Sequence, residues 1–167
     1  MSAGNLALRQ ALGSFATGVA VASVLDPDHG PLGLTINAFS SVSLEPPLIL
    51  WCLRKQSRAA ASFLSAERFA IQVLSRQQQD LSRLFASPGL EERKRAQFTR
   101  QRHGAPLLSG VAAWLACRRK CQHEEGDHLI FIGEVLEAQH EPERQPLVYW
   151  RGDYHQTHPL AILEPQP

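Results

Sequence analysis

The 167-residue chain lacks several features that would assign it to a particular class of protein. No stretch approaches the ~18 unbroken apolar residues that a membrane span needs, and the first residues have no long apolar segment of the kind found in secretory signals. The formal net charge is only +1, which gives no electrostatic reason to expect a nucleic acid partner. We therefore expect a cytoplasmic protein that binds neither membranes nor nucleic acids.

Cysteine is also scarce, and its odd number argues against a disulfide framework in a chain with no sign of secretion. Cys117 and Cys121, with His123 and His128 nearby, resemble a zinc site. However, positions four apart on a strand are separated by roughly 13 Å, whereas zinc binds each thiolate at about 2.3 Å. We expect Cys52, Cys117 and Cys121 to be free thiols, and we expect no metal.

Several motifs of large enzyme classes are missing as well. The sequence has no Gly-x-Gly-x-x-Gly fingerprint after a strand, no Walker loop, no Gly-x-Ser-x-Gly elbow and no His-Glu-x-x-His. Asp127 and His128 are neighbours, but no nucleophile loop accompanies them, so a hydrolytic triad is not indicated. A dedicated Rossmann site and the common hydrolase mechanisms are therefore not expected.

The patterns that are present favour strands over helices. Leu8, Ala11, Leu12 and Phe15 have helical spacing and predict an amphipathic helix over residues 5–17, packed on a core and ended by Gly18. Shorter helices are expected over 57–64 and from a Ser75 N-cap to Phe85, and 87–103 is expected to be a surface excursion. Strands are expected at 19–25, 32–37, 48–53, 68–74, 112–123, 128–136 and 146–150.

These elements predict a mainly β fold, an antiparallel barrel of six or seven strands with peripheral helices. Residues 26–31 are rich in turn formers and join two strands as a hairpin, and 48–53 is apolar enough for a strand buried on both faces. Strand and helix alternate in only one place, which disfavours a doubly wound sheet. No linker or repeat divides the chain, so we expect one domain over residues 1–167.

Three places carry candidate chemistry, and each has an ordinary structural alternative. The loop 35–43 is rich in hydroxyl and amide groups that suit a polar heterocycle, although such residues are common in turns. The basic segment 54–58 precedes a helix, where an anion would be held by helix amides, Ser57 and Arg58, but it is equally consistent with a solvated turn. His128 at the head of a strand is a candidate proton donor or ligand-orienting group, and a histidine that only bonds a turn carbonyl fits equally well.

Taken together, five segments resemble the flavin reductase-like family, the small reductase components of two-component flavin-dependent monooxygenases. The segments are Phe15-Ala16-Thr17-Gly18-Val19, the run from Gly33 to Ser43, Pro46-Pro47, Phe85-Ala86 and the run from Gly126 to Val135. They occur in the family's order and spacing across about residues 5–156. The resemblance implies a flavin-binding split barrel of Greek-key type, normally a homodimer with the flavin near the subunit interface.

The resemblance also implies the site. The flavin would contact Thr35, Asn37, Ala38, Ser40 and Ser41, the ring edge would meet Cys52 and Leu53, and the phosphate would fall on Ser57 and Arg58. Phe85 and Tyr154 would line the remaining wall, and His128 would lie beside the nicotinamide and the flavin, where it orients a ring or supplies a proton. The cofactor would be FMN or FAD, with NADH or NADPH as co-substrate.

The implied activity is an NAD(P)H:flavin oxidoreductase that supplies reduced flavin to a partner monooxygenase. The cofactors carry the hydride transfer, while the protein aligns two stacked rings. Backbone amides near residues 37–41 and 52–53 would stabilise the reduced flavin. Two alternatives remain open, a split-barrel flavin-binding oxidase and a non-catalytic flavin- or haem-binding module.

Overall fold

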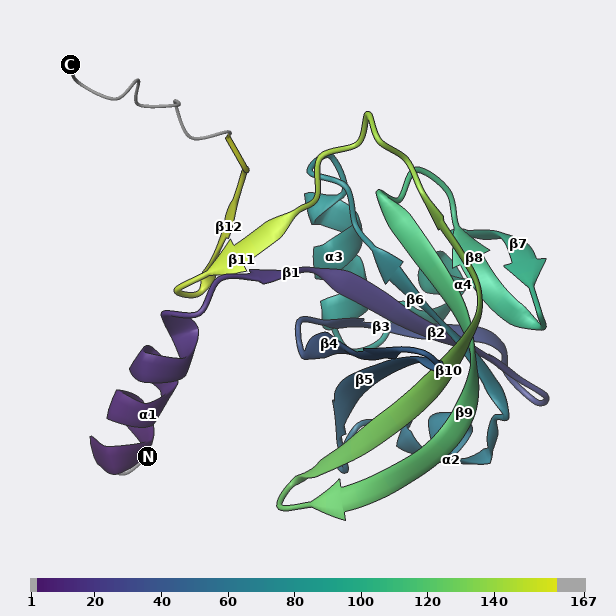
Figure 1. Ribbon diagram of the computed structural model, residues 1–167, viewed down its shortest axis with the longest axis horizontal. Helices are drawn as coiled ribbons and strands as arrows, with labels where there is room; N and C mark the ends of the chain where they lie inside the picture. The colour runs from purple at the N-terminus through teal and green to yellow at the C-terminus, as the bar shows by residue number, and fades with distance from the viewer. Residues whose placement is uncertain (1–2, 159–167) are drawn as a thin grey trace.

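The computed structural model describes residues 3–158, and the ends of the expected domain, residues 1–2 and 159–167, lie outside the described residues. Its centre is a seven-stranded antiparallel sheet with the strand order β3-β2-β6-β9-β10-β5-β4 (Figure 1). This confirms the prediction of a mainly β fold with peripheral helices. The strands are β2 (Ala20–Asp26), β3 (Gly30–Ile36), β4 (Phe39–Leu44), β5 (Pro47–Arg54), β6 (Arg68–Val73), β9 (Ala113–Glu125) and β10 (His128–His140).

The two edge strands of this sheet are consecutive in the chain. β3 ends at Ile36 and β4 begins at Phe39, so only Asn37 and Ala38 connect the two edges. Seven strands at roughly 4.8 Å spacing make a sheet too wide for two residues to span flat, so the sheet has to curl until its edges approach. The barrel is therefore joined at this seam by the chain itself rather than by a ladder between β3 and β4.

The connection between β3 and β4 differs from the expected polar loop over residues 35–43. Ser40 and Ser41 lie within β4, paired in register with Leu50 and Ile49 of β5. The run of small polar residues was expected to be a loop, but it forms a strand at the edge of the sheet. A strand there pairs with one neighbour only, and its other side can carry exposed polar residues.

The β2–β3 hairpin forms as its turn residues predict. The Oδ1 atom of Asp26 accepts hydrogen bonds from the backbone N–H groups of Asp28, at 3.0 Å, and His29, at 2.9 Å. An aspartate that bonds the backbone two residues ahead stabilises a tight turn. Gly30 then returns the chain to the sheet with a φ of 73°, in the left-handed region that glycine adopts without strain.

The core has two parts, one on each face of the sheet. On one face Trp51 is fully buried, stacked on Phe131 at a centroid distance of 4.8 Å and edge-on to Phe63 at 4.9 Å. The opposite face packs around Trp114, Leu107 and Leu108. β5 alternates between buried and partly exposed residues, so the prediction of a strand buried on both faces was wrong.

Three short helices and a hairpin cover the sheet. α2 (Ala60–Ser65) follows β5 and α3 (Gln79–Ala86) follows β6. Ser75 does not cap α3, whose N-cap is Gln78, because Ser75 instead forms an isolated bridge with Pro146. The expected surface excursion over 87–103 lies mostly at the surface, and it contains α4 (Glu91–Arg95) and β7 (Phe98–Arg102), which pairs with β8 (Ala105–Leu108).

The first helix, α1 (Ala3–Gly13), projects away from the sheet (Figure 1). It is attached through a small sheet of β1 (Thr17–Gly18), β11 (Val148–Trp150) and β12 (Asp153–His155). The expected packing of this helix on the core was wrong, because Leu8 and Leu12 are 56% and 66% exposed. Its end at Gly18 was wrong too, because Gly18 pairs with Val148.

Within residues 3–158 no helix is long and apolar enough to cross a membrane.

Candidate functional site

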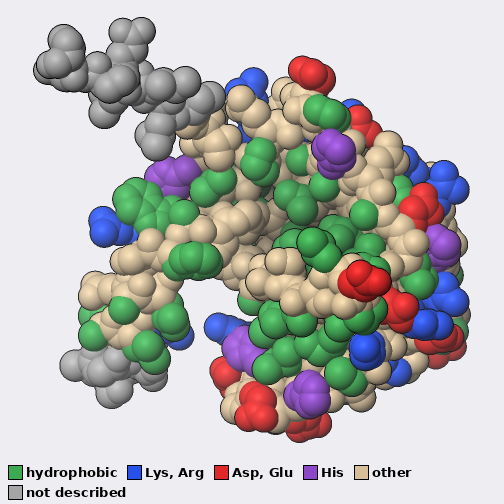
Figure 2. All heavy atoms as spheres, in the orientation of Figure 1, with side chains coloured by type: hydrophobic (Ala, Val, Ile, Leu, Met, Phe, Trp, Pro, Cys, Tyr) green, Lys and Arg blue, Asp and Glu red, His purple; other side chains and the backbone are tan. Residues whose placement is uncertain are grey.

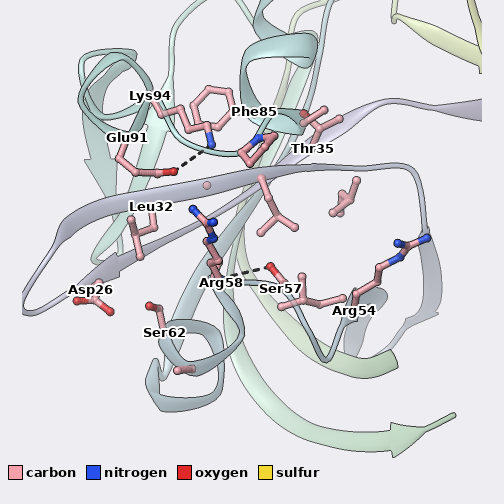
Figure 3. A pocket seen from close by; sticks show the side chains of 18 of the residues that line it. Asp26, Leu32, Thr35, Arg54, Ser57, Arg58, Ser62, Phe85, Glu91 and Lys94 are labelled. Atoms are coloured by element: carbon pink, nitrogen blue, oxygen red, sulfur yellow. Dashed lines mark hydrogen bonds and ion pairs between the residues drawn. The ribbon is translucent and has the colours of Figure 1, made fainter. Parts of the chain in front are cut away.

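A cleft of about 1220 Å³ runs along the edge strand β3. One wall comes from the end of β5 and from α2, and the other from the α3–α4 region, with Phe85 and Lys94 on that side (Figure 3). An edge strand has N–H and C=O groups that no neighbouring strand satisfies, so the cleft offers backbone as well as side-chain hydrogen bonds. Leu32, Leu34 and Leu53 add apolar surface, a combination typical of sites for planar organic ligands.

The residues at the seam between the edge strands line this cleft. Thr35, Asn37 and Ala38 all contribute to its wall, and Asn37 and Ala38 are exposed. The Thr35 hydroxyl donates to the backbone carbonyl of Ser82 at 2.7 Å, so its proton serves to tie β3 to α3. What Thr35 presents to a ligand is therefore an oxygen acceptor.

Cys52 and Leu53 reach the cleft from the end of β5. The Cys52 N–H donates to the Ala38 carbonyl at 3.0 Å, which fixes the seam but removes that amide from those expected to stabilise a bound ligand. Partial burial raises the pKa of the Cys52 thiol. Cys52 therefore presents a neutral thiol, which suits contact with an uncharged ring edge.

The basic segment after β5 lies in the same cleft, with Arg54, Ser57 and Arg58 in its wall. The Ser57 Oγ accepts from the Ala59 N–H at 3.3 Å and keeps its own proton available. α2 begins only at Ala60 and has six residues, so helix amides contribute less than expected. An anion here would be held mainly by the Ser57 hydroxyl and the Arg58 guanidinium.

His128 is the first residue of β10 and is paired in register with Arg54, which brings it to the same end of the cleft. Its Nδ1 lies 2.7 Å from the Asp127 carboxylate, and among the described residues its Nε2 has no hydrogen-bond partner. The contact with His128, followed by the charge of that ring, lowers the pKa of Asp127. Asp127 thus orients the ring and leaves Nε2 for a ligand.

Of the other expected site residues, Phe85 lines the cleft but three do not. Ser40 and Ser41 are exposed on β4. Tyr154 lies on β12, where its hydroxyl is 2.9 Å from Ser82 Oγ. Within one copy of the chain the structure does not bring these three to the cleft, and their contact with a flavin stays a prediction.

Sequence reasoning missed the residues that α4 contributes. Glu91, Lys94 and Arg95 line the cleft, and Lys94 is only 6% exposed although it lies in a run of charged residues. Its Nζ donates to the Ser87 carbonyl at 2.8 Å and to Glu91 at 3.3 Å. Nothing in a polar run marks which lysine will be buried, so only the packing of α4 near β3 reveals this wall.

All three cysteines are free, and burial raises the pKa of Cys117 to about 12. Across residues 3–158 no group of three or more His, Cys, Asp or Glu side chains is placed to hold a metal ion.

In a comparison with known protein families, residues 12–158 match the Flavin reductase like domain. The chain is similar to a probable flavin reductase of Rhizobium meliloti, with 47% identity over 148 residues, covering 89% of this chain and 47% of that protein. It is 42% identical over 146 residues to the FMN reductase (NADH) SmoA of Agrobacterium fabrum, covering 87% and 82% of the two. The chain thus spans about half the length of some relatives and most of others.

Solved structures agree with the sequence comparison. The NADH:FAD oxidoreductase SgcE6 of Streptomyces globisporus, in complex with NAD and FAD fragments, superposes with a TM-score of 0.86 at 35% identity, covering 93% of each chain. Two further relatives, at 40% and 34% identity, are named as reductase parts of flavin-dependent monooxygenases.

Proposed function

The chain belongs to the flavin reductase-like family, and from that premise we propose that it is an NAD(P)H:flavin oxidoreductase that supplies reduced flavin to a partner monooxygenase. The observation that carries the proposal is the meeting of three distant segments in one cleft: residues 35–38, residues 52–58 and His128. The relatives named as FMN reductase and as reductase components of monooxygenases support the same activity.

The cleft fits a flavin in its chemistry. Leu34, Leu53 and the neutral Cys52 thiol provide a surface for the ring, and the edge of β3 provides backbone groups for its polar rim. Ser57 and Arg58 provide a hydroxyl and a guanidinium for a phosphate, a pairing whose charge-assisted hydrogen bonds are strong. A bound flavin supplies the redox chemistry by accepting hydride from a reduced nicotinamide.

The protein's own contribution is to hold the reactants and to place His128. Because Asp127 engages Nδ1, the Nε2 atom of His128 is the nitrogen available to orient a nicotinamide or to move a proton at the mouth of the cleft. Replacing His128 with Asn should lower kcat while leaving the affinity for flavin within about threefold, a change too small for loss of a strong contact.

The proposal is tested by adding NADH or NADPH to the purified protein with FMN or FAD and following the near-ultraviolet absorbance of the reduced nicotinamide. We expect the reduced nicotinamide to be oxidised with at least one combination of nucleotide and flavin. If it is oxidised with none of them, the proposed activity is wrong. Residual binding of flavin without consumption would then favour a non-catalytic binding module.

We further propose that the protein acts as a homodimer. Exposed apolar side chains lie on α1 and just after its end: Leu8 and Leu12 share one face of the helix and are 56% and 66% exposed, and Phe15, two residues past Gly13, is 77% exposed. Figure 2 shows hydrophobic side chains gathered on this projecting arm, with a gap between the arm and the body. Contiguous exposed apolar surface of this kind is typical of an interface between chains.

We place the reaction in the cytoplasm and treat the chain as one flavin reductase-like domain over residues 1–167, with a core at about 5–156. Three free thiols are consistent with a reducing compartment.

A further inference from the structure

The cleft does not end at the proposed phosphate site. Beyond Arg58 it continues past Leu32 and the exposed face of α2 to the β2–β3 turn, with Ala61, Ser62, Ser65 and Asp26 to His29 in its wall. We call this part the far section. The whole cleft, at about 1220 Å³, exceeds the roughly 300–1,000 Å³ of ordinary small-ligand pockets. A single nucleotide placed with its ring at the seam would leave the far section unused.

Two cations mark the boundary of the far section. Arg58 from one wall and Lys94 from the other point toward each other across the cleft (Figure 3). Lys94 is 6% exposed, and its two hydrogen bonds, to the Ser87 carbonyl and to Glu91, use two of its three N–H donors. The Nε atom of the next residue, Arg95, is also buried and has no hydrogen-bond partner among the described residues.

The charge at this boundary is unbalanced. Arg58, Lys94 and Arg95 bring three positive charges to the cleft, and Glu91 brings one negative charge. Removing a cation from water is costly unless an opposite charge or enough acceptors accompany it. A ligand with more than one negative charge, bound between the two walls, would neutralise the excess positive charge.

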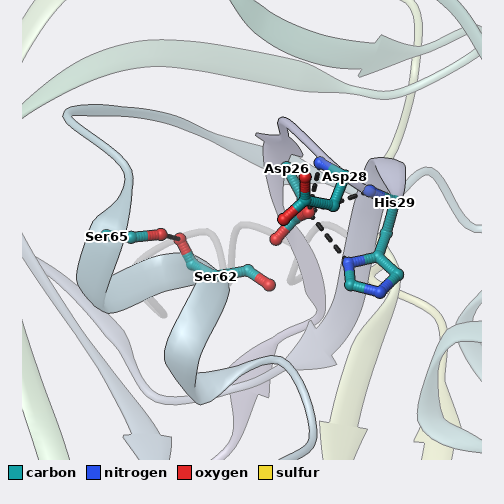
Figure 4. A network of polar contacts seen from close by, with 5 residues as sticks. All are labelled: Asp26, Asp28, His29, Ser62 and Ser65. Atoms are coloured by element: carbon teal, nitrogen blue, oxygen red, sulfur yellow. Dashed lines mark hydrogen bonds and ion pairs between the residues drawn. The ribbon is translucent and has the colours of Figure 1, made fainter.

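The far section has the opposite character. The Asp26 carboxylate is held by the N–H groups of Asp28 and His29, and the His29 ring lies 2.9 Å from it (Figure 4). The nearby Ser62 hydroxyl, followed by these His29 contacts, lowers the pKa of Asp26 well below its usual range. Asp26 is therefore a pure acceptor, and its charge disfavours a further phosphate. Hydroxyl and amino groups of a neutral nucleoside are better suited to it.

We propose that this cleft is built for a flavin dinucleotide, FAD, rather than for FMN. The diphosphate lies between Arg58 and Lys94, and the adenosine occupies the far section and ends at Asp26. The inference rests on the proposed function for the position of the ring. The names of relatives do not decide it, since one is an FMN reductase and another an NADH:FAD oxidoreductase.

Equilibrium binding of FAD and FMN to the full chain, read from flavin fluorescence without nicotinamide, tests the inference. FAD should bind at least about tenfold more tightly than FMN. Ala61→Trp places a large side chain in the far section from an exposed position, so it should abolish this advantage and leave the Kd of FMN unchanged. Leu64→Trp, on the same helix but outside the cleft, is the matched control.

A second pair of variants tests the boundary. Lys94→Met should weaken FAD at least about tenfold and weaken FMN less, whereas Arg93→Met, an exposed neighbour outside the cleft, should change neither. Equal affinity of the unaltered chain for FAD and FMN, or equal effects of Ala61→Trp on both, would overturn the inference. If the two flavins behave equally but NADH is still oxidised, the FAD site is wrong and the proposed function stands. If FAD binds preferentially but NADH is not oxidised, the proposed activity is wrong and the FAD site stands. Absence of any flavin binding overturns both.

Discussion

The exposed apolar side chains on α1 and just after its end allow a quantitative test of the homodimer. Leu12 is 66% exposed and Phe15 is 77% exposed in the single chain. Complete burial of such a side chain stabilises by about 1.5–3 kcal/mol, so scaling by these fractions gives about 2–4 kcal/mol for the pair in one protomer. Because a two-fold interface uses the same patch twice, the double change to Ser should cost about 4–9 kcal/mol of association free energy.

Sedimentation equilibrium over a range of concentrations measures this change. A loss of about 4–9 kcal/mol corresponds to a dimer Kd raised by about 10³–10⁶. Thermal unfolding of the dissociated double variant should stay cooperative, since neither side chain belongs to the core of its own chain. Leu25→Ser, a 40% exposed leucine on β2, is the control and should leave association unchanged. An unaltered protein that is monomeric, or a double variant that dimerises as tightly, would refute the reasoning.

Three further outcomes concern stability. Trp51→Ala should lower the free energy of unfolding by about 3–5 kcal/mol, because the ring is fully buried between aromatic neighbours; a urea titration that shows less than about 1 kcal/mol would contradict this. Gly133→Ala should cost about 1–3 kcal/mol, because its Cβ would lie 2.5 Å from Phe69 Cζ, and a melting temperature equal to that of the unaltered protein would show that the ring can move aside. Folding lowers the pKa of Asp26, so its carboxylate stabilises the fold above about pH 3.8, the pKa of an unperturbed aspartate, and this contribution is lost as the pH falls below that value. The free energy of unfolding of Asp26→Asn should therefore depend less on pH in that range, whereas that of Asp28→Asn should depend on pH as in the unaltered protein. Parallel acid titrations of the two variants would contradict the assignment to Asp26.

The strands of the main sheet were largely predictable because their signals are local. The small and β-branched residues of β2 and the turn chemistry of Asp26 and Gly30 act within a few residues of one another. The meeting of residues 35–38, residues 52–58 and His128 in one cleft followed from the family resemblance, and the fold brings them there through the register of β5 with β10.

The parts that could not be predicted depend on distant packing. Helical spacing in α1 correctly predicts a helix with one apolar face, but it cannot say whether that face meets the chain's own core. Likewise, the burial of Lys94 depends on how α4 lies near β3, and the charged run 91–95 carries no local sign of it. β4 was missed because its serines look like loop residues. They are tolerated in a strand at the edge of the sheet, where most of the strand is exposed and only β5 pairs with it.

The most direct test of the central claim is anaerobic. The purified chain is loaded with oxidised flavin, one equivalent of NADH or NADPH is added, and the visible absorbance of the flavin is followed. We expect the yellow colour to be bleached in step with oxidation of the nicotinamide, and more slowly in the His128→Asn variant. A bound flavin that stays oxidised with both nucleotides would contradict it.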